Sequence, residues 1–159
     1  MGTQAIYPGS FDPITLGHVD VIERASQMFE TVTVVVARNS RKTPLFDEQE
    51  RHEMASESLR HLPNVRVVVH AGLVVDYAIE NGATVIVRGI RAVTDFEYEF
   101  QIALMNRKLQ PLVSTIFLMP HEKYTYLNSS IIRELSRYHQ NLSEFVPPIV
   151  ADRLTKKFS

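Results

Sequence analysis

The sequence predicts a Rossmann-like α/β fold, a doubly wound five-stranded parallel sheet with helices on both faces. Short apolar runs alternate with helical patterns along the whole chain, an order typical of parallel α/β sheets. The apolar runs are continuous rather than interrupted by polar residues, as expected for strands covered on both faces. At 159 residues the chain can bury a substantial core, so we expect a single domain over residues 1–159.

The first predicted strand, residues 4–7, leads into the loop YPGSFDPITLGH at residues 7–18. Two prolines stiffen this loop, and its two glycines permit positive φ or a close approach of the backbone to a ligand. Apolar residues at helical spacing then predict a helix from His18 to Phe29. Free N–H groups and the helix dipole at such an N-terminus favour an anion. We therefore interpret the segment as a phosphate-handling loop.

The remaining strands and helices follow in alternation. Strands are predicted at residues 32–37, 65–69, 84–87 and 114–119. Asp47 followed by Glu50 is a capping-box-like start for a helix that runs to about residue 61. Thr94 with Glu97 is a second such pattern, which opens a helix over residues 95–109. Further helices are predicted over residues 73–80, from near residue 128, and after Pro147-Pro148.

Polar loops come directly after the predicted strands. These loops hold Ser10, Lys42, Arg88 with Arg91, and residues 124–130. The carboxyl ends of parallel strands meet at one edge of a sheet, and ligands bind there at the point where the strand order reverses. The sequence therefore predicts that these loops converge on one site.

Composition excludes several classes of function. The 17 basic and 18 acidic residues leave a net charge of −1, so no overall field favours nucleic acid or an acidic membrane surface. The chain has no cysteine, hence no disulfide framework and no thiol chemistry. No charged leader or apolar run of about 20 residues is present, so we expect a cytoplasmic protein. The histidines other than His18 show no recognised zinc spacing, and no structural metal site is expected.

Three ordered motifs carry a resemblance to a known family. YPGSFDP at residues 7–13, followed by TLGH at residues 15–18, resembles the T/HxGH signature of the nucleotidylyltransferase superfamily. RGIRAVTDFEYE at residues 88–99 resembles the stretch that distinguishes the bacterial phosphopantetheine adenylyltransferases. NSSIIR at residues 128–133 resembles the second superfamily motif, usually written ISSTxxR.

The resemblance implies a reaction in which AMP passes from ATP to 4′-phosphopantetheine, giving dephospho-CoA and pyrophosphate in the penultimate step of coenzyme A synthesis. It implies a direct in-line attack without a covalent enzyme intermediate, which fits a chain that lacks cysteine. Catalysis of this kind is mostly positioning and charge stabilisation. The resemblance further implies that Mg2+ arrives with ATP rather than in a protein cage, and that the chain forms a homohexamer.

By family position, five residues handle the reacting phosphates. His18 stabilises the transition state, and Ser10 binds both ATP and the attacking phosphate, replacing the threonine of many relatives. Lys42 binds the acceptor phosphate and takes part in catalysis. Arg88 holds the acceptor, whereas Arg91 contacts the nucleotide phosphates as a catalytic residue. Each residue also has a purely structural explanation. The histidine would cap the helix, the serine would belong to a turn, and the basic side chains would be solvated on the surface.

The remaining site residues are implied in the same way. The predicted ATP contacts are Phe11, Gly89, Ile90, Glu99, Tyr124, Thr125, Tyr126, Leu127, Asn128, Ser129 and Ser130. Leu73 and Val74 would form the pantetheine-side wall, although core packing explains two aliphatic residues equally well. An ordinary helix cap is the alternative for both serines, and Asp12 could orient the loop rather than touch substrate.

Two other functions remain open. A related nucleotidylyltransferase with another phosphate acceptor would keep the fold and the phosphate chemistry. A nucleotide-sensing module without turnover would keep only the ATP pocket, which an intact set of His18, Lys42 and Arg88 disfavours.

Overall fold

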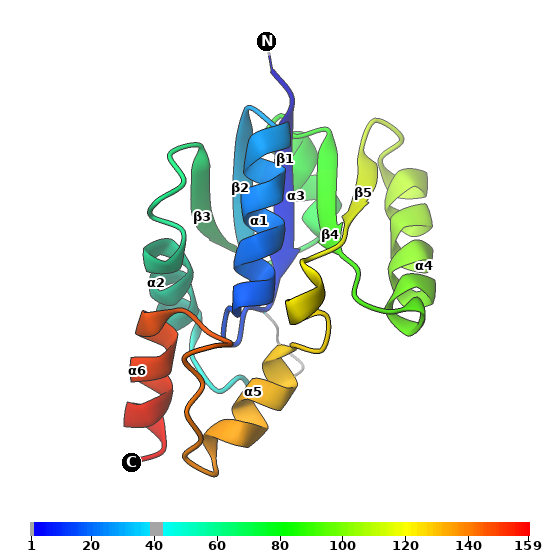
Figure 1. Cartoon of the computed structure of the whole chain (residues 1–159). Helices are drawn as coiled ribbons and strands as arrows, with labels where there is room; N and C mark the ends of the chain where they lie inside the picture. Colours follow the sequence, from blue (N-terminus) through cyan, green and yellow to red (C-terminus); the bar gives the residue numbers. More distant parts are fainter. Residues whose placement is uncertain (1, 39–42) are drawn as a thin grey trace.

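One parallel sheet organises the protein (Figure 1). The structure is a computed structural model that describes residues 2–38 and 43–159, with the side chains of residues 93 and 94 left undescribed. Within these residues the sheet has five strands in the order β3-β2-β1-β4-β5. They are β1 (Gln4–Gly9), β2 (Thr31–Ala37), β3 (Val65–His70), β4 (Val85–Gly89) and β5 (Ser114–Leu118). All four neighbouring pairs are parallel, which confirms the predicted fold class.

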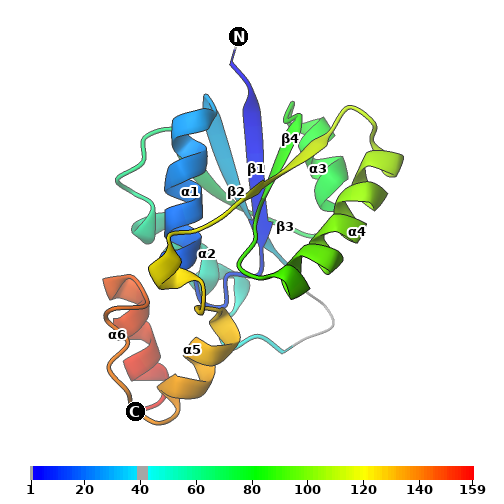
Figure 2. The same cartoon turned by 45° about the vertical axis from the view of Figure 1, so that its right-hand side comes forward.

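Helices connect the strands and cover both faces of the sheet. They are α1 (Leu16–Met28), α2 (Glu48–Ser58), α3 (Val74–Glu80), α4 (Val93–Leu109), α5 (Ser129–Ser136) and α6 (Pro148–Lys157), with a 3-10 turn at Glu122–Tyr124. Helix α1 lies in front of the sheet and α3 behind it, while α4 lies on the flank beyond β4 and β5 (Figures 1 and 2). None of the helices within the described residues is long and apolar enough to span a bilayer.

Successive residues of the buried strands pack into two separate apolar layers. On the α1 face, Val34 and Val87 belong to the same buried cluster as Ile22 of α1. On the opposite face, Ile6 and Ile86 cluster with residues of α3. Because side chains alternate across a strand, the continuous apolar runs supply both layers at once.

Side chains cap the starts of helices α1, α2 and α5. Asp47 and Glu50 form a reciprocal capping box at the start of α2, as predicted. The predicted Thr94–Glu97 box is wrong, because α4 begins at Val93 after Ala92, whose side chain makes no cap hydrogen bond. The extended backbone of Ala92 already starts the helix, which puts residue 94 inside the first turn.

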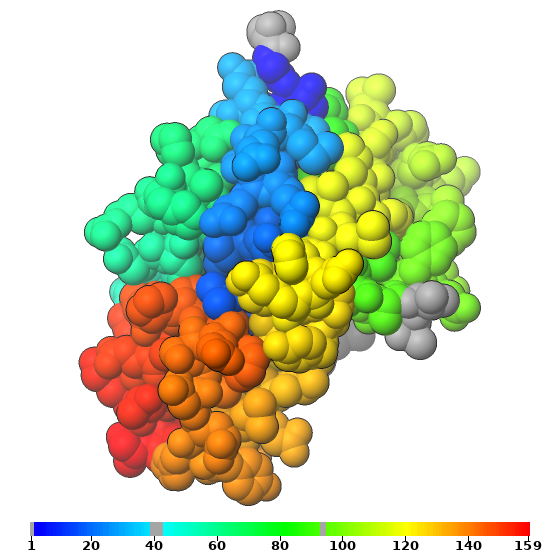
Figure 3. Space-filling model, viewed as in Figure 1, coloured from blue at the N-terminus to red at the C-terminus, as the bar shows by residue number. Residues whose placement is uncertain are grey.

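The segment after β5 returns to α1. It lies against α1 in the space-filling view (Figure 3), where the backbone N–H of His121 donates to Asp20 at 2.8 Å. This contact brings the end of β5 and the start of α5 close to the loop that follows β1, on the side where the strand order reverses between β1 and β4.

Candidate active site

A cavity of about 450 Å³ opens beyond the carboxyl ends of β1 and β4. These two strands flank the reversal of strand order, where ligands of open α/β sheets bind. The cavity is walled by the loop after β1, the end of β4, the start of α4 and the start of α5. The loops that the sequence predicted to converge therefore do meet, for the part of the chain that the structure describes.

The cavity brings together many of the predicted site residues. Those that line it are Ser10, Phe11, His18, Arg88, Gly89, Arg91, Glu99, Leu127, Asn128 and Ser129. Those that lie outside its lining are Leu73, Val74, Ile90, Tyr124, Thr125, Tyr126 and Ser130. Lys42 falls outside the described residues.

The loop after β1 is shaped by aromatic packing. Phe11 is buried and has a positive φ of 48°, a conformation uncommon for a residue with a side chain. A Cβ on Gly9 would meet the Phe11 ring at 3.0 Å, so glycine at this position admits the ring. Phe11 makes edge contacts with Tyr7, at 5.6 Å between ring centroids, and with His18, at 5.1 Å. The close approach predicted for this glycine is thus to an aromatic ring of the loop itself.

His18 lies in the first turn of α1 and takes part in its N-terminal cap. Its Nδ1 accepts a hydrogen bond from the backbone N–H of Thr15 at 3.0 Å, and the Thr15 hydroxyl accepts from the backbone N–H of His18 at 3.3 Å. This is a capping box with histidine in the place that glutamate or glutamine usually takes. Because Nδ1 is an acceptor, the proton of the neutral ring lies on Nε2.

His18 is kept neutral by its surroundings. Burial, and then the positive charges of Arg91 and Arg88, lower the pKa of His18 from 6.5 to about 4. At neutral pH the ring therefore presents an uncharged N–H donor at the cavity that it lines. Bound phosphates would oppose this shift, because a nearby negative charge favours the protonated ring.

Arg88 is held by a carboxylate of the protein. Its Nε and Nη2 donate to the two oxygens of Glu99 at 2.8 and 2.7 Å, and Nη1 donates to the carbonyl of Pro8 at 2.6 Å. Glu99 is only 11% exposed in this pair. The anionic partner expected for a partly buried arginine is thus Glu99 of α4. These contacts hold the guanidinium in a fixed place at the cavity, which Arg88 lines.

Arg91 is anchored at two points. Its Nη1 donates to the carbonyl of Leu127, and its Nε lies 3.3 Å from the carboxylate of Asp95, in the first turn of α4. The first contact ties the end of β4 to the segment before α5. Both arginines are therefore positioned by acidic residues of α4.

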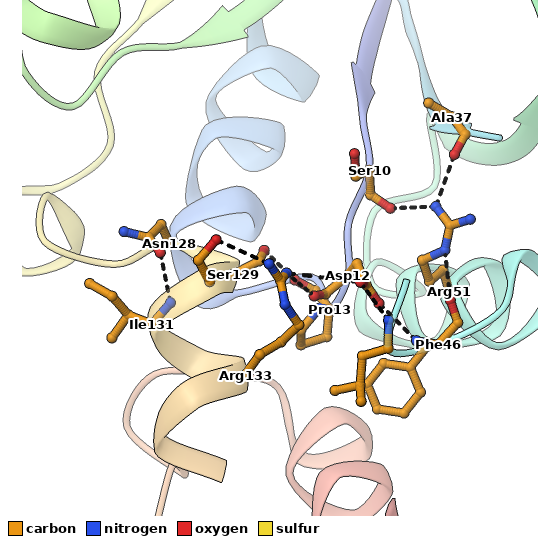
Figure 4. Close-up of polar contacts among 12 residues, drawn as sticks. Ser10, Asp12, Pro13, Ala37, Phe46, Arg51, Asn128, Ser129, Ile131 and Arg133 are labelled. Carbon is orange, nitrogen blue, oxygen red and sulfur yellow. Dashed lines mark hydrogen bonds and ion pairs between the residues drawn. The ribbon is translucent and has the colours of Figure 1, made fainter. Parts of the chain in front are cut away.

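Asp12 and Arg133 fix the loop after β1 from two sides (Figure 4). The Asp12 carboxylate accepts the backbone N–H groups of Leu45 and Phe46, both at 2.9 Å. Arg133 of α5 donates to the Asp12 carbonyl at 2.6 Å. Asp12 is 7% exposed, so it orients the loop rather than facing the cavity.

Arg51 is a buried support that the sequence analysis missed. It is 4% exposed, and its guanidinium donates to the carbonyls of Ser10, Ala37 and Phe46 at 2.8, 2.9 and 3.1 Å (Figure 4). Arg51 thereby joins the loop after β1 to the end of β2 and the start of α2. The only signal in the sequence is a basic residue on the otherwise apolar side of a short helix.

The start of α5 has its own hydrogen bonds. Asn128 caps the helix by accepting from the backbone N–H of Ile131 at 2.8 Å. The Ser129 hydroxyl donates to the carbonyl of Pro13 at 2.8 Å, and the Ser130 hydroxyl accepts from Arg133 at 3.0 Å. Helix capping and contacts within the protein therefore account for the polar atoms of these three side chains. Asn128 and Ser129 also line the cavity.

The predicted residues outside the cavity lining have other surroundings. Leu73 is exposed ahead of α3, and Val74 packs against the apolar layer behind the sheet. Ile90 donates its backbone N–H to the carbonyl of Leu118. Tyr124 lies against Gly17 of α1, and Tyr126 is exposed beside Phe145.

Comparison with known proteins identifies the family. The model of the cytidylyltransferase-like family matches residues 6–135. A phosphopantetheine adenylyltransferase from Caldanaerobacter subterraneus is 53% identical over 154 residues, covering 97% of this chain and 96% of its own. One from Methylococcus capsulatus is 53% identical over 159 residues, covering 100% and 98%. The chain belongs to the phosphopantetheine adenylyltransferase family.

Solved structures of other proteins share the fold of this member of the phosphopantetheine adenylyltransferase family. A protein from Vibrio parahaemolyticus, proposed to be a nicotinate-nucleotide adenylyltransferase, has a TM-score of 0.71 at 19% identity, covering 97% of this chain and 91% of its own. A lipopolysaccharide core biosynthesis protein from Thermoplasma volcanium has a TM-score of 0.55 at 24% identity, covering 76% and 98%. At these identities the likeness concerns the fold alone.

Proposed function

We infer that this chain transfers the adenylyl group of ATP to 4′-phosphopantetheine, giving dephospho-CoA and pyrophosphate. The observation that carries this inference is 53% identity over essentially the whole length of relatives that bear this activity in their name. The cavity supports it, because it combines a helix N-terminus, a neutral histidine and two oriented arginines, groups that suit phosphate chemistry.

The reaction needs one displacement. An oxygen of the acceptor phosphate attacks the α-phosphorus of ATP, and the bond from that phosphorus to the bridging oxygen breaks, releasing pyrophosphate. We propose that the Nε2–H of His18 donates to the phosphoryl oxygens, which gather negative charge in the transition state. Replacing His18 with Ala should then lower turnover far more than ATP affinity, and equal losses in both would reassign the residue.

The other predicted roles remain proposals. Ser10 would donate its hydroxyl to the attacking phosphate and to ATP, and Lys42 would bind the acceptor phosphate. Arg88, with its fork oriented by Glu99, would face the acceptor, and Arg91 the nucleotide phosphates.

Magnesium is proposed to enter with ATP. The carboxylates of the cavity are Asp95 and Glu99, and each is paired with an arginine. Within the described residues, no three histidine or acidic side chains gather as a metal site. A hard cation such as Mg2+ would thus be held chiefly by phosphate oxygens and water, where it neutralises charge on the nucleotide.

We further propose that the chain self-associates in the cytoplasm, as a hexamer by family resemblance. Large apolar residues of α4 are exposed, namely Phe96, Phe100, Ile102, Leu104, Met105 and Leu109, on the flank seen in Figure 2. Monomeric proteins rarely expose so many apolar side chains together. Light scattering should give a mass several times 18.2 kDa, whereas a monomer at micromolar concentration would contradict the proposal.

The deciding experiment is mass-spectrometric detection of dephospho-CoA from ATP and 4′-phosphopantetheine with the purified protein. Parallel reactions should contain nicotinamide mononucleotide or glycerol 3-phosphate as the acceptor. Product from either of these, with none from phosphopantetheine, would favour a related nucleotidylyltransferase. ATP binding without product from any acceptor would favour a nucleotide-sensing module.

A further inference from the structure

Tyr7 carries a buried hydroxyl that the mechanism above does not use. The residue lies on β1 and is 5% exposed. Its hydroxyl makes no hydrogen bond with any residue that the structure describes. In those residues, every side-chain oxygen or nitrogen that is fully enclosed has a hydrogen-bond partner, so the Tyr7 oxygen is not fully enclosed. The Tyr7 oxygen therefore reaches open space, and that space is the cavity, which Tyr7 lines.

The hydroxyl is held at a defined place on the cavity floor. A Cβ on Gly89 would lie 3.4 Å from the Tyr7 oxygen, so the hydroxyl sits directly beside the end of β4. The ring is fixed by its edge contact with Phe11 and by the apolar layer on the α1 face. The oxygen cannot turn away to bulk water without disturbing this packing.

The charges around Tyr7 suit an anion. Arg88 and Arg91 are its cationic neighbours, and Glu99 is the anionic one, but Glu99 already accepts two bonds from Arg88. Burial raises the pKa of Tyr7 to about 12, so the phenol keeps its proton at any working pH. A neutral O–H donor near two guanidinium groups matches the oxygens of a phosphate.

We propose that Tyr7 is a further substrate-contacting residue, whose hydroxyl donates a hydrogen bond to a phosphate oxygen in the cavity. This rests on the proposed function for the identity of the substrates, because both ATP and phosphopantetheine carry phosphate. The bond satisfies a donor that lacks a partner in the described protein and leaves the covalent chemistry to the residues already named.

Tyr7→Phe tests the proposal because it removes only the hydroxyl and keeps the ring that packs on Phe11. Tyr138→Phe is the matched control, since Tyr138 is 68% exposed and lies outside the cavity lining. Three quantities are measured for each variant and the wild type: the unfolding temperature without ligand, the Kd for ATP alone and for phosphopantetheine alone, and kcat/KM for both substrates.

The apo unfolding temperature of Tyr7→Phe should equal or exceed that of the wild type, because no hydrogen bond within the described protein is lost. Affinity for one of the two ligands, and kcat/KM, should fall about tenfold to a hundredfold, the usual effect of a lost hydrogen bond to a charged group. A fall with ATP alone assigns the contact to the nucleotide, and a fall with phosphopantetheine alone assigns it to the acceptor.

Two results would overturn the proposal. Affinities and kcat/KM within twofold of wild type would show that the hydroxyl touches no substrate. A lower apo unfolding temperature, with equal losses for every ligand, would show a structural role. If the wild type makes no dephospho-CoA, the proposed function fails, while the two binding measurements still decide the role of Tyr7.

Discussion

Protonation of His18 should make the protein less stable in mild acid. The neutral ring accepts the Thr15 N–H through Nδ1, and a protonated ring has no acceptor atom left for that bond. Acid therefore opens the capping box at the start of α1 and places a positive charge near Arg88 and Arg91. The same proton would change the donor that His18 presents to the cavity.

The sign and size follow from the pKa difference. The folded protein holds the pKa of His18 at about 4 against an ordinary 6.5, so between these values the unfolded chain binds more protons and stability falls as pH falls. Each unit of difference corresponds to about 1.4 kcal/mol. Between about pH 7.5 and about pH 4.5, His18 should cost the wild type about 2 kcal/mol of unfolding free energy.

Urea unfolding at the two pH values measures this loss. His18→Gln does not titrate, and its amide oxygen can still accept the Thr15 N–H, so its stability should fall by about 2 kcal/mol less than that of the wild type. His139→Asn is the control, because His139 is exposed and asparagine tolerates its φ of 55°. Equal pH dependence in the wild type and His18→Gln would refute the reasoning.

Three further predictions concern the supports of the site. Arg51→Met should lower the unfolding free energy by about 3 kcal/mol in urea, because three buried carbonyls lose their donor; a loss below about 1 kcal/mol would mean that water replaces it. Asp12→Asn should lower the unfolding free energy by about 2 kcal/mol in the same assay, because the amide replaces one of the two accepting oxygens with an NH2 group. An unchanged unfolding midpoint would contradict this. Glu99→Gln should cost about 2 kcal/mol and raise KM for the acceptor, as Arg88 loses its orienting charge, whereas an unchanged KM would separate Arg88 from acceptor binding.

The fold could be predicted because its signals are local. Strands buried on both faces are visible in the sequence as continuous apolar runs. The Asp47 cap is recognisable because its partner, Glu50, lies only three residues away. The same locality explains the error at Thr94, since a cap pattern cannot say which neighbouring residue has the extended backbone. The capping box of His18 is equally local, but histidine is not the residue usually sought at that position.

The supports of the site could not be predicted because their partners are distant in sequence. Arg51 reaches a carbonyl 41 residues away and another 14 residues away. Arg133 reaches Asp12 across 121 residues. Glu99 follows Arg88 closely, but their pairing depends on how α4 packs against β5. A motif names the residues at a site, whereas the packing of the whole chain decides how each one is held.

Two separate sets of contacts support the cavity. The loop after β1 rests on the α1 layer through Phe11 and Ile14, whereas the Arg88–Glu99 pair depends on α4, which packs on β5 through Phe96 and Phe117. Hydrogen bonds join the two sides, because Arg88 donates to the carbonyl of Pro8 and Arg91 to that of Leu127. Substitutions on the α4 side that keep these two bonds should therefore reshape one wall of the cavity while the packing of Phe11 and Ile14 stays in place.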